Sequence, residues 1–271
     1  MKLPLSEFLS PYGRRTGTVR TLREGPVLRV ELDRPAEGNT VTEAMLDDLL
    51  TVLAVPDPEV RVLVLSGAGP DFSLGGDRNE FADWLDEDPT GSGIRIAGDK
   101  ARRVCEALTG CPAVTVARVQ GKVIGAGLAL ALACDLRVGA DTTTFRLPEL
   151  ALGLPTAWGG VLPRLINEIG AARARELILT GRVFDAHEAY ELSVLQKVAP
   201  EAELDRAVAE WTKPIVRRPE SALRVTKALF ASYAAPTRLA DPSLLDAELM
   251  ASVAAAHHYA RTSGSRGTRA R

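Results

Sequence analysis

One stretch of the chain, residues 118–135, constrains the fold more than any other. It begins as the end of an apolar, β-rich run, passes through Gly121, Gly125 and Gly127, and continues as a run of small apolar residues that predicts a tightly packed helix. A strand that enters a glycine-rich turn and opens a buried helix can receive an anionic group, because the first N–H groups of a helix lack intrahelical partners. Two alternatives stay open: glycines that only allow close helix packing, and a degenerate dinucleotide loop.

A second glycine turn, Gly75-Gly76, also follows an apolar strand and precedes helical sequence. If the two helix starts face each other, one N–H group from each forms an oxyanion hole; the alternative is a pair of tight turns. A dinucleotide fingerprint is not met. After the predicted strand at 60–66 the third glycine is missing and Pro70 interrupts the helix start, and the turn at 125–127 lacks the third glycine as well.

Composition narrows the class of protein. The chain has 271 residues, a formal net charge of −2 and a pI near 6.0, which gives no reason to expect a nucleic-acid partner. Cys105 and Cys134 lie in apolar helical patterns, and no CxxC pair is present, so we expect free thiols and a cytoplasmic location. The adjacent His257 and His258 lack the i, i+4 spacing of a metal pair, so we predict no metal site. No run is apolar enough to predict a membrane span.

The order of predicted elements indicates an α/β fold in front and a helical region behind. Thr40, with Glu43 three residues later, predicts a capping box at the start of a helix. Residues 86–93 are acidic and contain glycine, serine and proline, which predicts a loop. From Leu162 onwards the pattern is helical, interrupted by one strand at 194–198.

We therefore divide the chain into three parts. Residues 1–200 form the α/β core, and residues 201–260 form a C-terminal helical region whose apolar faces suggest an oligomer interface. Residues 261–271 contain four arginines with serine, glycine and threonine. This composition predicts a solvated, disordered basic tail rather than a phosphate-binding arm.

Two carboxylates and one aromatic residue are the candidates for chemistry. Glu149 lies between Pro148 and an apolar run, where burial raises the pKa of a carboxyl group and suits it to general acid–base catalysis; the alternative is a helix cap. Asp77 is most simply a carboxylate at a helix N-terminus. Trp158, beside two glycines, either lines an acyl pocket or packs in the core.

Several segments resemble the enoyl-CoA hydratase/isomerase (crotonase) superfamily in the right order and spacing. Residues 62–77 (VLVLSGAGPDFSLGGD) are similar to the family segment vvLtGaGkaFsaGaD. Residues 119–130 (VQGKVIGAGLAL), with Cys134-Asp135, are similar to nGyalGgGcela and the following cD. Residues 145–153 (FRLPELALG) are similar to fgqPEi.lG, and residues 181–200 also match the family pattern. The resemblance covers nearly the whole chain.

The resemblance implies a spiral of ββα units with a helical trimerisation region, and so a homotrimer or a dimer of trimers. It implies a thioester substrate whose carbonyl oxygen receives the backbone N–H groups of Gly76 and Ala126, with Glu149 as the acid–base residue. It implies no cofactor other than the coenzyme A that carries the substrate. The substrate-binding positions that follow from it are Ser73, Leu74, Gly75, Gly125 and Trp158.

Departures from the family pattern narrow the expected reaction. The second glutamate of the hydratases falls on Ala129, which transfers no proton. The usual Pro-Gly before the second glycine pair is replaced by residues 156–158, and the usual basic residue before Asn39 is Gly38. A single carboxylate suits enoyl double-bond isomerisation better than hydration. Hydratase, decarboxylase, C–C hydrolase and a catalytically silent assembly subunit stay as alternatives, as does an acyl-carrier-protein thioester.

Overall fold

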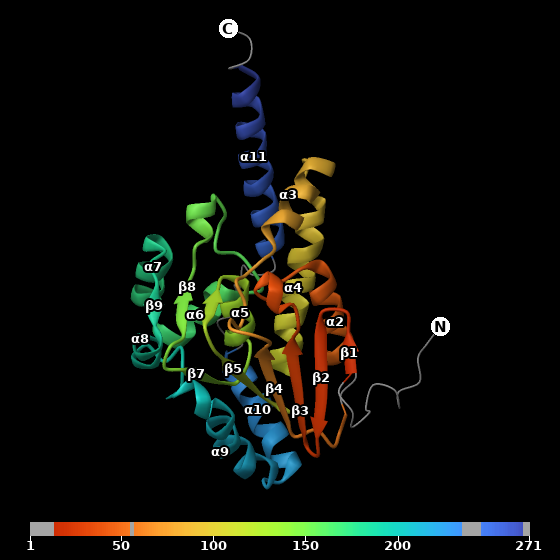
Figure 1. The fold of residues 1–271 in the computed structure, drawn as a ribbon, viewed down its shortest axis with the longest axis vertical. Coiled ribbons are helices and arrows are strands. Elements are labelled where there is room, and N and C mark those ends of the chain that lie inside the picture. Colours follow the sequence, from red (N-terminus) through yellow and green to blue (C-terminus); the bar gives the residue numbers. More distant parts are fainter. Residues whose placement is uncertain (1–13, 55–56, 235–244, 268–271) are drawn as a thin grey trace, which may run out of the picture.

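The computed structural model describes residues 14–54, 57–234 and 245–267, and its strands form two sheets (Figure 1). The larger sheet has seven strands in the order β1-β2-β3-β4-β5-β7-β10, antiparallel from β1 to β3 and parallel from β3 to β10. In the smaller sheet, β8 pairs parallel with β6 and antiparallel with β9. The strands are β1 (Arg14–Thr16), β2 (Val19–Glu24), β3 (Val27–Leu32), β4 (Val62–Gly67), β5 (Val114–Val119), β6 (Lys122–Ile124), β7 (Leu136–Ala140), β8 (Thr144–Arg146), β9 (Phe184–Asp185) and β10 (Lys197–Ala199).

Helices follow the strands and cover the large sheet on both faces, which confirms the predicted mixed α/β fold (Figure 1). The α-helices are α2 (Glu43–Leu53), α3 (Arg78–Glu87), α4 (Ser92–Gly110), α5 (Ala126–Leu132), α6 (Val161–Ile169), α7 (Ala171–Thr180), α8 (Ala186–Glu191), α9 (Leu204–Val216), α10 (Glu220–Ala234) and α11 (Asp246–Gly267). Short 3₁₀ helices occupy Pro35–Glu37, Glu149–Leu152 and Glu201–Glu203.

The first four residues of the central strand β4, 62–65, are apolar and buried, as expected of a strand covered on both faces. Leu63 and Leu65 point into the main core, which α2, α4 and α5 complete. Val62 and Val64 point the opposite way, into a smaller core closed by α9. Helix α5 is buried along its whole length, so its small residues allow the close packing that the sequence predicts.

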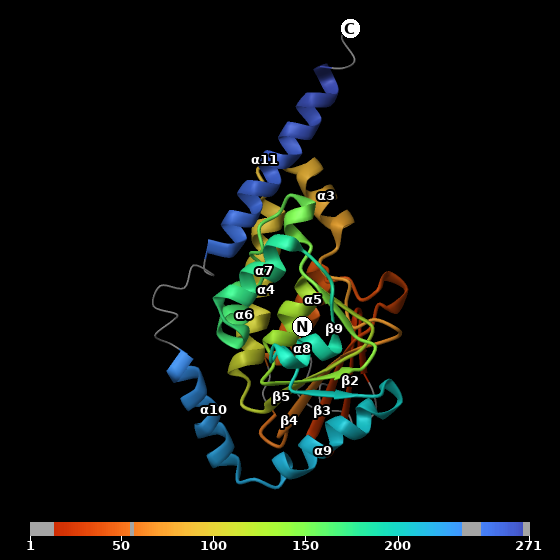
Figure 2. The same cartoon turned by 90° about the vertical axis from the view of Figure 1, so that its left-hand side faces the viewer.

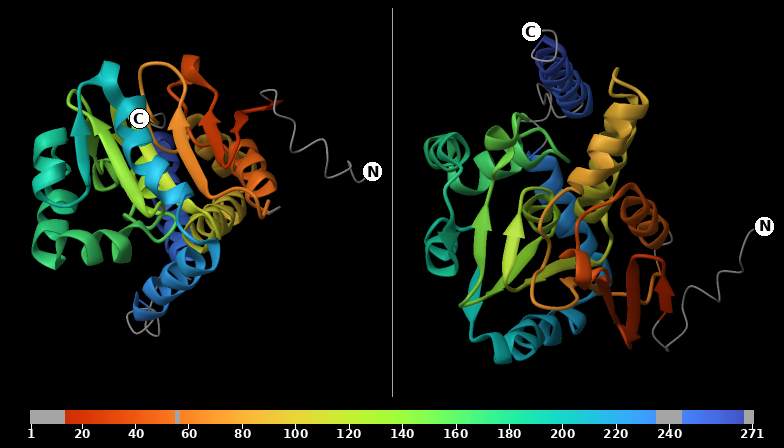
Figure 3. Two further views of the ribbon diagram at one scale, coloured as in Figure 1. Left: turned by 90° about the horizontal axis from the view of Figure 1, so that it is seen from below. Right: turned by 45° about the horizontal axis from the view of Figure 1, so that its top comes forward.

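Helix α9 belongs to the core, although the predicted division at residue 200 assigns it to the C-terminal region. Its residues Leu204, Ala207 and Val208 are buried against strands β4, β5 and β7, and Figure 3 shows the helix crossing this face of the sheet. Helices α10 and α11 lie along one side of the molecule (Figure 2). The helical region outside the sheet therefore begins after α9.

Four local predictions differ from the structure. Helix α2 is capped by the Thr42 hydroxyl, which accepts from the Met45 N–H, whereas the Thr40 hydroxyl donates to Asp77. The predicted loop at 86–93 is shorter in the structure and spans only residues 88–91, because α3 extends to Glu87 and α4 begins at Ser92. The late strand is β10, shorter than the predicted 194–198, and the short strand β9 was not predicted.

The C-terminal helix is longer than predicted. Helix α11 continues to Gly267, so the tail expected to be disordered from residue 261 is helical as far as the structure describes it, and 268–271 lie outside the described residues. Its first half packs on α4, where Met250, Ala251 and Ala254 are buried, and its second half projects beyond the body (Figure 1). None of the described helices is long and apolar enough to cross a membrane.

Candidate active site

The turn at Gly75-Gly76 is held in place by a buried asparagine and a buried serine. The Asn39 side chain donates to the carbonyls of Ala68 and Asp71 at 2.8 and 2.9 Å, which fixes the loop after β4. The Ser73 hydroxyl donates to the Asn39 carbonyl at 2.8 Å and accepts from the Gly75 N–H at 3.2 Å. These hydrogen bonds hold the turn in its conformation with groups of the protein itself.

Hydrogen bonds on one side of the turn decide where the Gly76 N–H group points. Val41 donates to the Gly75 carbonyl at 2.8 Å and accepts from the Asp77 N–H at 3.0 Å, as in a parallel bridge. In this pattern the residue between the two bonds directs its own N–H to the opposite side. None of the hydrogen bonds among the described residues uses the Gly76 N–H, which therefore faces away from Val41 and towards the second glycine turn.

The second turn, Gly125-Ala126, lies directly beside the first. Ser73 accepts from Ile124 at 2.9 Å and donates to Lys122 at 3.2 Å, so the two segments run together. A methyl group placed on Gly75 would be 3.1 Å from the Ile124 carbonyl oxygen and 3.8 Å from the Ala126 nitrogen. The Ala126 N–H opens α5 and donates to no group in the described part of the chain. Two free N–H groups thus lie at adjoining turns.

The register of the small sheet brings Glu149 to the same place. Strands β6 and β8 pair so that Ile124 is opposite Arg146, and the Gly125 N–H donates to the Arg146 carbonyl at 3.0 Å. The chain then passes through Pro148 into the 3₁₀ helix that begins at Glu149. A methyl group on Gly125 would lie 2.7 Å from Glu149 Oε1, so the missing side chain leaves room for the carboxylate.

The Glu149 carboxylate is poorly solvated. Its Oε2 atom is buried and has no hydrogen-bond partner. Burial raises the pKa of Glu149 to about 7, and its own backbone N–H offsets this only in part. A carboxyl group with such a pKa exchanges a proton readily near neutral pH, as general acid–base catalysis requires.

Asp77 has the opposite environment, although it follows Gly76 directly. Burial would raise its pKa, but hydrogen bonds from the Glu80 amide, the Thr40 hydroxyl and the Asn79 amide lower it below the ordinary value, with help from the charge of Arg34. Its carboxylate caps the N-terminus of α3. The structure thus confirms the helix-terminal interpretation of Asp77.

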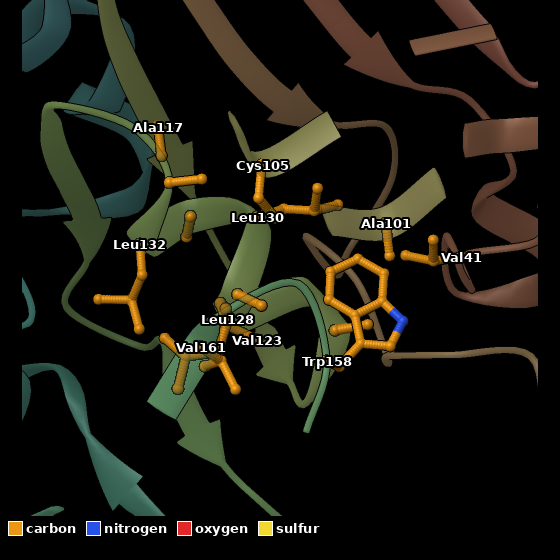
Figure 4. Close-up of a cluster of buried hydrophobic side chains, with 14 of the residues drawn as sticks. Val41, Ala101, Cys105, Ala117, Val123, Leu128, Leu130, Leu132, Trp158 and Val161 are labelled. Carbon is orange, nitrogen blue, oxygen red and sulfur yellow. The ribbon is translucent and has the colours of Figure 1, made fainter. Parts of the chain in front are cut away.

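The remaining predicted site residues differ in how they meet this region. Ser73 is fully buried and its hydroxyl is engaged within the protein, so it shapes the turn rather than offering a free group. Leu74 is 37% exposed and covers Gly38, where a methyl group would lie 2.4 Å from its side chain. Trp158 packs in the main core with Val41 and Ala101 (Figure 4).

Two residues that contribute to this region were not singled out as site residues from the sequence. Asn39, noted from the sequence only as the residue after Gly38, is fully buried and anchors the first glycine turn. Thr156, noticed only as a replacement for a family proline, is buried with an unpartnered hydroxyl. A signal for Asn39 was present in its position directly after Gly38, because asparagine is common in turns that need a left-handed backbone, and Asn39 has a φ of 51°. Among the described residues, no group of His, Cys, Asp and Glu side chains is arranged to hold a metal ion.

A large hollow lies elsewhere, on the outer face of the large sheet. It has a volume of about 600 Å³ and includes none of the predicted site residues. Its arginines are already engaged, since Arg20 pairs with Glu31 at 2.5 Å and Arg118 with Asp205 at 3.0 Å. The turns and Glu149, not this hollow, concentrate the unpartnered polar groups.

Comparison with known proteins places this geometry in a family. The family model described as enoyl-CoA hydratase/isomerase matches residues 23–267. The enoyl-CoA isomerase/hydratase fer4 of Mycosarcoma maydis is 33% identical over 214 residues, covering 74% of this chain and 75% of that protein.

Solved structures agree with this assignment. An enoyl-CoA hydratase/carnithine racemase of Magnetospirillum magneticum is 27% identical with a TM-score of 0.77, covering 85% of this chain and 86% of that one. A Thermobifida fusca protein solved in complex with acetoacetyl-CoA is 31% identical with a TM-score of 0.75, covering 90% of this chain and 98% of that one. The chain therefore belongs to the enoyl-CoA hydratase/isomerase family, within the crotonase superfamily.

Proposed function

We propose that this protein acts on acyl-CoA thioesters and moves the double bond of a 3-enoyl thioester to the 2-position, with Glu149 as the single proton carrier. The observation that carries the proposal is a desolvated, unpartnered carboxylate beside two turns that each offer a free N–H group. Membership of the family and a related structure with acetoacetyl-CoA bound support coenzyme A as the carrier of the acyl group.

The thioester carbonyl is the group that the two turns would receive. The N–H groups of Gly76 and Ala126 would donate to its oxygen, and Gly75 and Gly125 would let the backbone come close. When a proton leaves C2, negative charge moves onto this oxygen. Fixed donors at that position stabilise the charge and require no rearrangement during the reaction.

Glu149 then completes the isomerisation alone. Its carboxylate removes a proton from C2, which gives a dienolate with its charge on the thioester oxygen. The resulting carboxylic acid returns the same proton to C4, and the double bond comes to rest between C2 and C3. A pKa about 7 suits both halves of this transfer, because neither protonation state of Glu149 is strongly favoured at neutral pH.

Hydration is the second candidate, because the similar fungal protein carries both activities in its name. Adding water to a 2-enoyl thioester requires a water molecule that is held and activated at C3. Ala129, at the position of the second hydratase glutamate, is fully buried and contributes no polar group for this purpose. This residue supports isomerisation as the faster reaction.

We also infer that the protein assembles as a trimer or a dimer of trimers. Large apolar side chains are exposed on the two helices outside the sheet: Val225, Leu229 and Phe230 on α10, and Leu249, Val253 and Tyr259 on α11. Contact between copies would bury these side chains. Light scattering at micromolar concentration should give a trimeric or hexameric mass, and a monomeric mass would contradict the inference.

A side-by-side assay tests the proposed reaction. Wild-type protein should convert a 3-enoyl-CoA to the 2-enoyl form faster than it hydrates a 2-enoyl-CoA, as followed by chromatography of the thioesters. Ala129→Glu should raise the hydration rate, whereas Ala129→Gln, which has the same size and no charge, should not. Efficient hydration by the wild type without isomerisation would assign the protein as a hydratase instead.

A further inference from the structure

Two side-chain oxygens in the described part of the chain are closed to solvent and have no hydrogen-bond partner: Glu149 Oε2 and Thr156 Oγ1. Both belong to one short segment, residues 149–156. An unpartnered buried polar group costs free energy, so its presence in a folded protein calls for an explanation such as a ligand or an ordered water. The acid–base role accounts for Glu149, but nothing in the proposed proton transfer uses Thr156.

The segment that carries Thr156 runs from the carboxylate to the surroundings of the first glycine turn. Near one end, the Leu154 N–H donates to the Glu149 carbonyl at 2.9 Å. Just beyond the other end, Trp158 joins the same buried cluster as Val41, which bonds to the residues on both sides of Gly76 (Figure 4). Thr156 lies between these two anchors and is only 7% exposed. Its hydroxyl is therefore enclosed on the short segment that connects the proton carrier to the cluster containing Trp158 and Val41.

The local structure gives the hydroxyl no other task. Thr156 does not cap α6, whose N-cap is Gly160 with no side-chain hydrogen bond. The turn itself is closed by the backbone, where the Ala157 N–H donates to the Pro155 carbonyl at 2.9 Å. A valine would have the same shape without an unpartnered oxygen, so folding alone gives no advantage to threonine here.

We propose that Thr156 determines specificity: its hydroxyl, with Glu149 Oε2, holds one hydroxyl-type oxygen of the reacting complex. This inference rests on the proposed function. The oxygen belongs either to a hydroxyl group on the acyl chain or to a water molecule in the acyl pocket, and both present the same O–H···O chemistry. A plain hydrocarbon chain without such a water leaves both buried oxygens unpartnered, and a site built around a hydrogen bond discriminates against ligands that lack it.

The test uses Thr156→Val and Thr156→Ser as a matched pair. Each variant is assayed with two 3-enoyl-CoA substrates that differ by one hydroxyl group on the acyl chain, and with an unsubstituted 2-enoyl-CoA for hydration. If the acyl chain supplies the oxygen, Thr156→Val should raise KM for the hydroxylated substrate by roughly 10–100-fold. Thr156→Ser keeps the hydroxyl group, so its KM for this substrate should stay close to the wild-type value. The readout is the ratio of the KM values for the two 3-enoyl substrates, which a uniform change in activity does not alter.

If a water molecule in the acyl pocket supplies the oxygen, the expected changes in the rates are different. Thr156→Val would then lower the hydration rate of the unsubstituted 2-enoyl-CoA by a similar factor and leave the preference between the two 3-enoyl substrates unchanged. If neither quantity changes in Thr156→Val, or if Thr156→Ser behaves like valine, the inference is wrong. A purely structural role would lower the melting temperature of Thr156→Val, whereas we expect an equal or higher value.

Binding separates this inference from the proposed function. Calorimetry with saturated acyl-CoA and its hydroxylated analogue measures recognition without any turnover. In one outcome, the wild type binds the hydroxylated analogue more tightly and this preference is lost in Thr156→Val, yet no isomerisation is observed. That result would overturn the proposed reaction and keep the specificity role of Thr156. Normal isomerisation with no effect of Thr156→Val in any assay would keep the reaction and overturn the specificity role.

Discussion

Glu149 and Asp77 are two carboxylates of the same region with opposite environments. Each begins a helical segment near one of the glycine turns, and each was a candidate acid–base residue. Asp77 is the N-cap of α3 and accepts hydrogen bonds from two amides and a hydroxyl, which lower its pKa. Glu149 is buried with one oxygen unpartnered, which raises its pKa to about 7.

This contrast shows that hydrogen-bond satisfaction, rather than position in the chain, separates the reactive carboxylate from the structural one. A carboxylate that accepts several hydrogen bonds is held in its charged form and is a weak base. A carboxylate in an apolar enclosure lies close to the balance between its two forms.

The largest effect should come from neutralising Glu149. Glu149→Gln keeps the shape of the side chain but removes the proton carrier, so isomerisation should fall by roughly 10²–10⁴, the usual range for a general base. Asp77→Asn is the matched control and should keep activity close to wild type, because asparagine also caps helices. Equal losses in the two variants, with acyl-CoA still bound, would remove the distinction between them.

Removing one backbone donor should have the next largest effect. Ala126→Pro eliminates the N–H group at the start of α5, and we expect a loss of roughly 10² or more in rate. Proline is tolerated in the first turn of a helix, so the fold should survive. Ala126→Gly keeps the N–H and should be mild. An active Ala126→Pro variant with an unchanged melting temperature would show that this N–H does not take part.

The raised pKa of Glu149 also predicts a stability change with a defined sign. Because the pKa of Glu149 is higher in the folded state than in the unfolded state, the protonated side chain contributes fully to the free energy of unfolding below the unfolded-state pKa. This contribution is lost as the pH rises through about 7. At pH 8 Glu149→Gln should therefore be more stable than wild type by about 1–3 kcal/mol, with no advantage at pH 4. Denaturant unfolding at the two pH values measures this, and an equal difference at both would contradict it.

The smallest effect should come from the cap at Asp77. Asp77→Ala should cost about 0.5–2 kcal/mol of stability at neutral pH, the usual range for an N-cap. Because the folded-state pKa is lowered, this contribution is present above the unfolded value and is lost as the pH falls through the folded one. The difference in the free energy of unfolding between Asp77→Ala and wild type should therefore disappear at low pH. A gap that persists at low pH would mean that the charge does not stabilise the cap.

Periodic and motif-bearing elements could be predicted from the sequence, because their signals are local. The buried strand β4 overlaps its predicted position, and the apolar run after Pro148 indicated the burial of Glu149. The predictions that were wrong concern residues whose contacts are distant in the sequence. Thr42 rather than Thr40 caps α2, because the Thr40 hydroxyl is engaged by Asp77 on another segment. Likewise, nothing local assigns α9 to the core rather than to the C-terminal helices.

The arrangement of the candidate site also depends on contacts between residues that are distant in the sequence. That Gly125 makes room for Glu149 depends on the register between β6 and β8, which no local pattern fixes. The unpartnered hydroxyl of Thr156 is invisible in sequence, because an unmet hydrogen bond is a property of the whole enclosure. Trp158 admitted two interpretations, and its place in the core follows only from the packed structure.

A label-transfer experiment tests the central claim, a single enclosed carboxylate that carries the proton, most directly. A 3-enoyl-CoA deuterated at C2 is converted in ordinary water, and the 2-enoyl product is analysed by mass spectrometry and NMR after less than one turnover. One carboxylate shielded from solvent should deliver a measurable share of the deuterium from C2 to C4, and Glu149→Gln should abolish the transfer together with turnover. Efficient isomerisation with no deuterium at C4 would show that separate or solvent-exchanging groups handle the two protons, and would contradict the account.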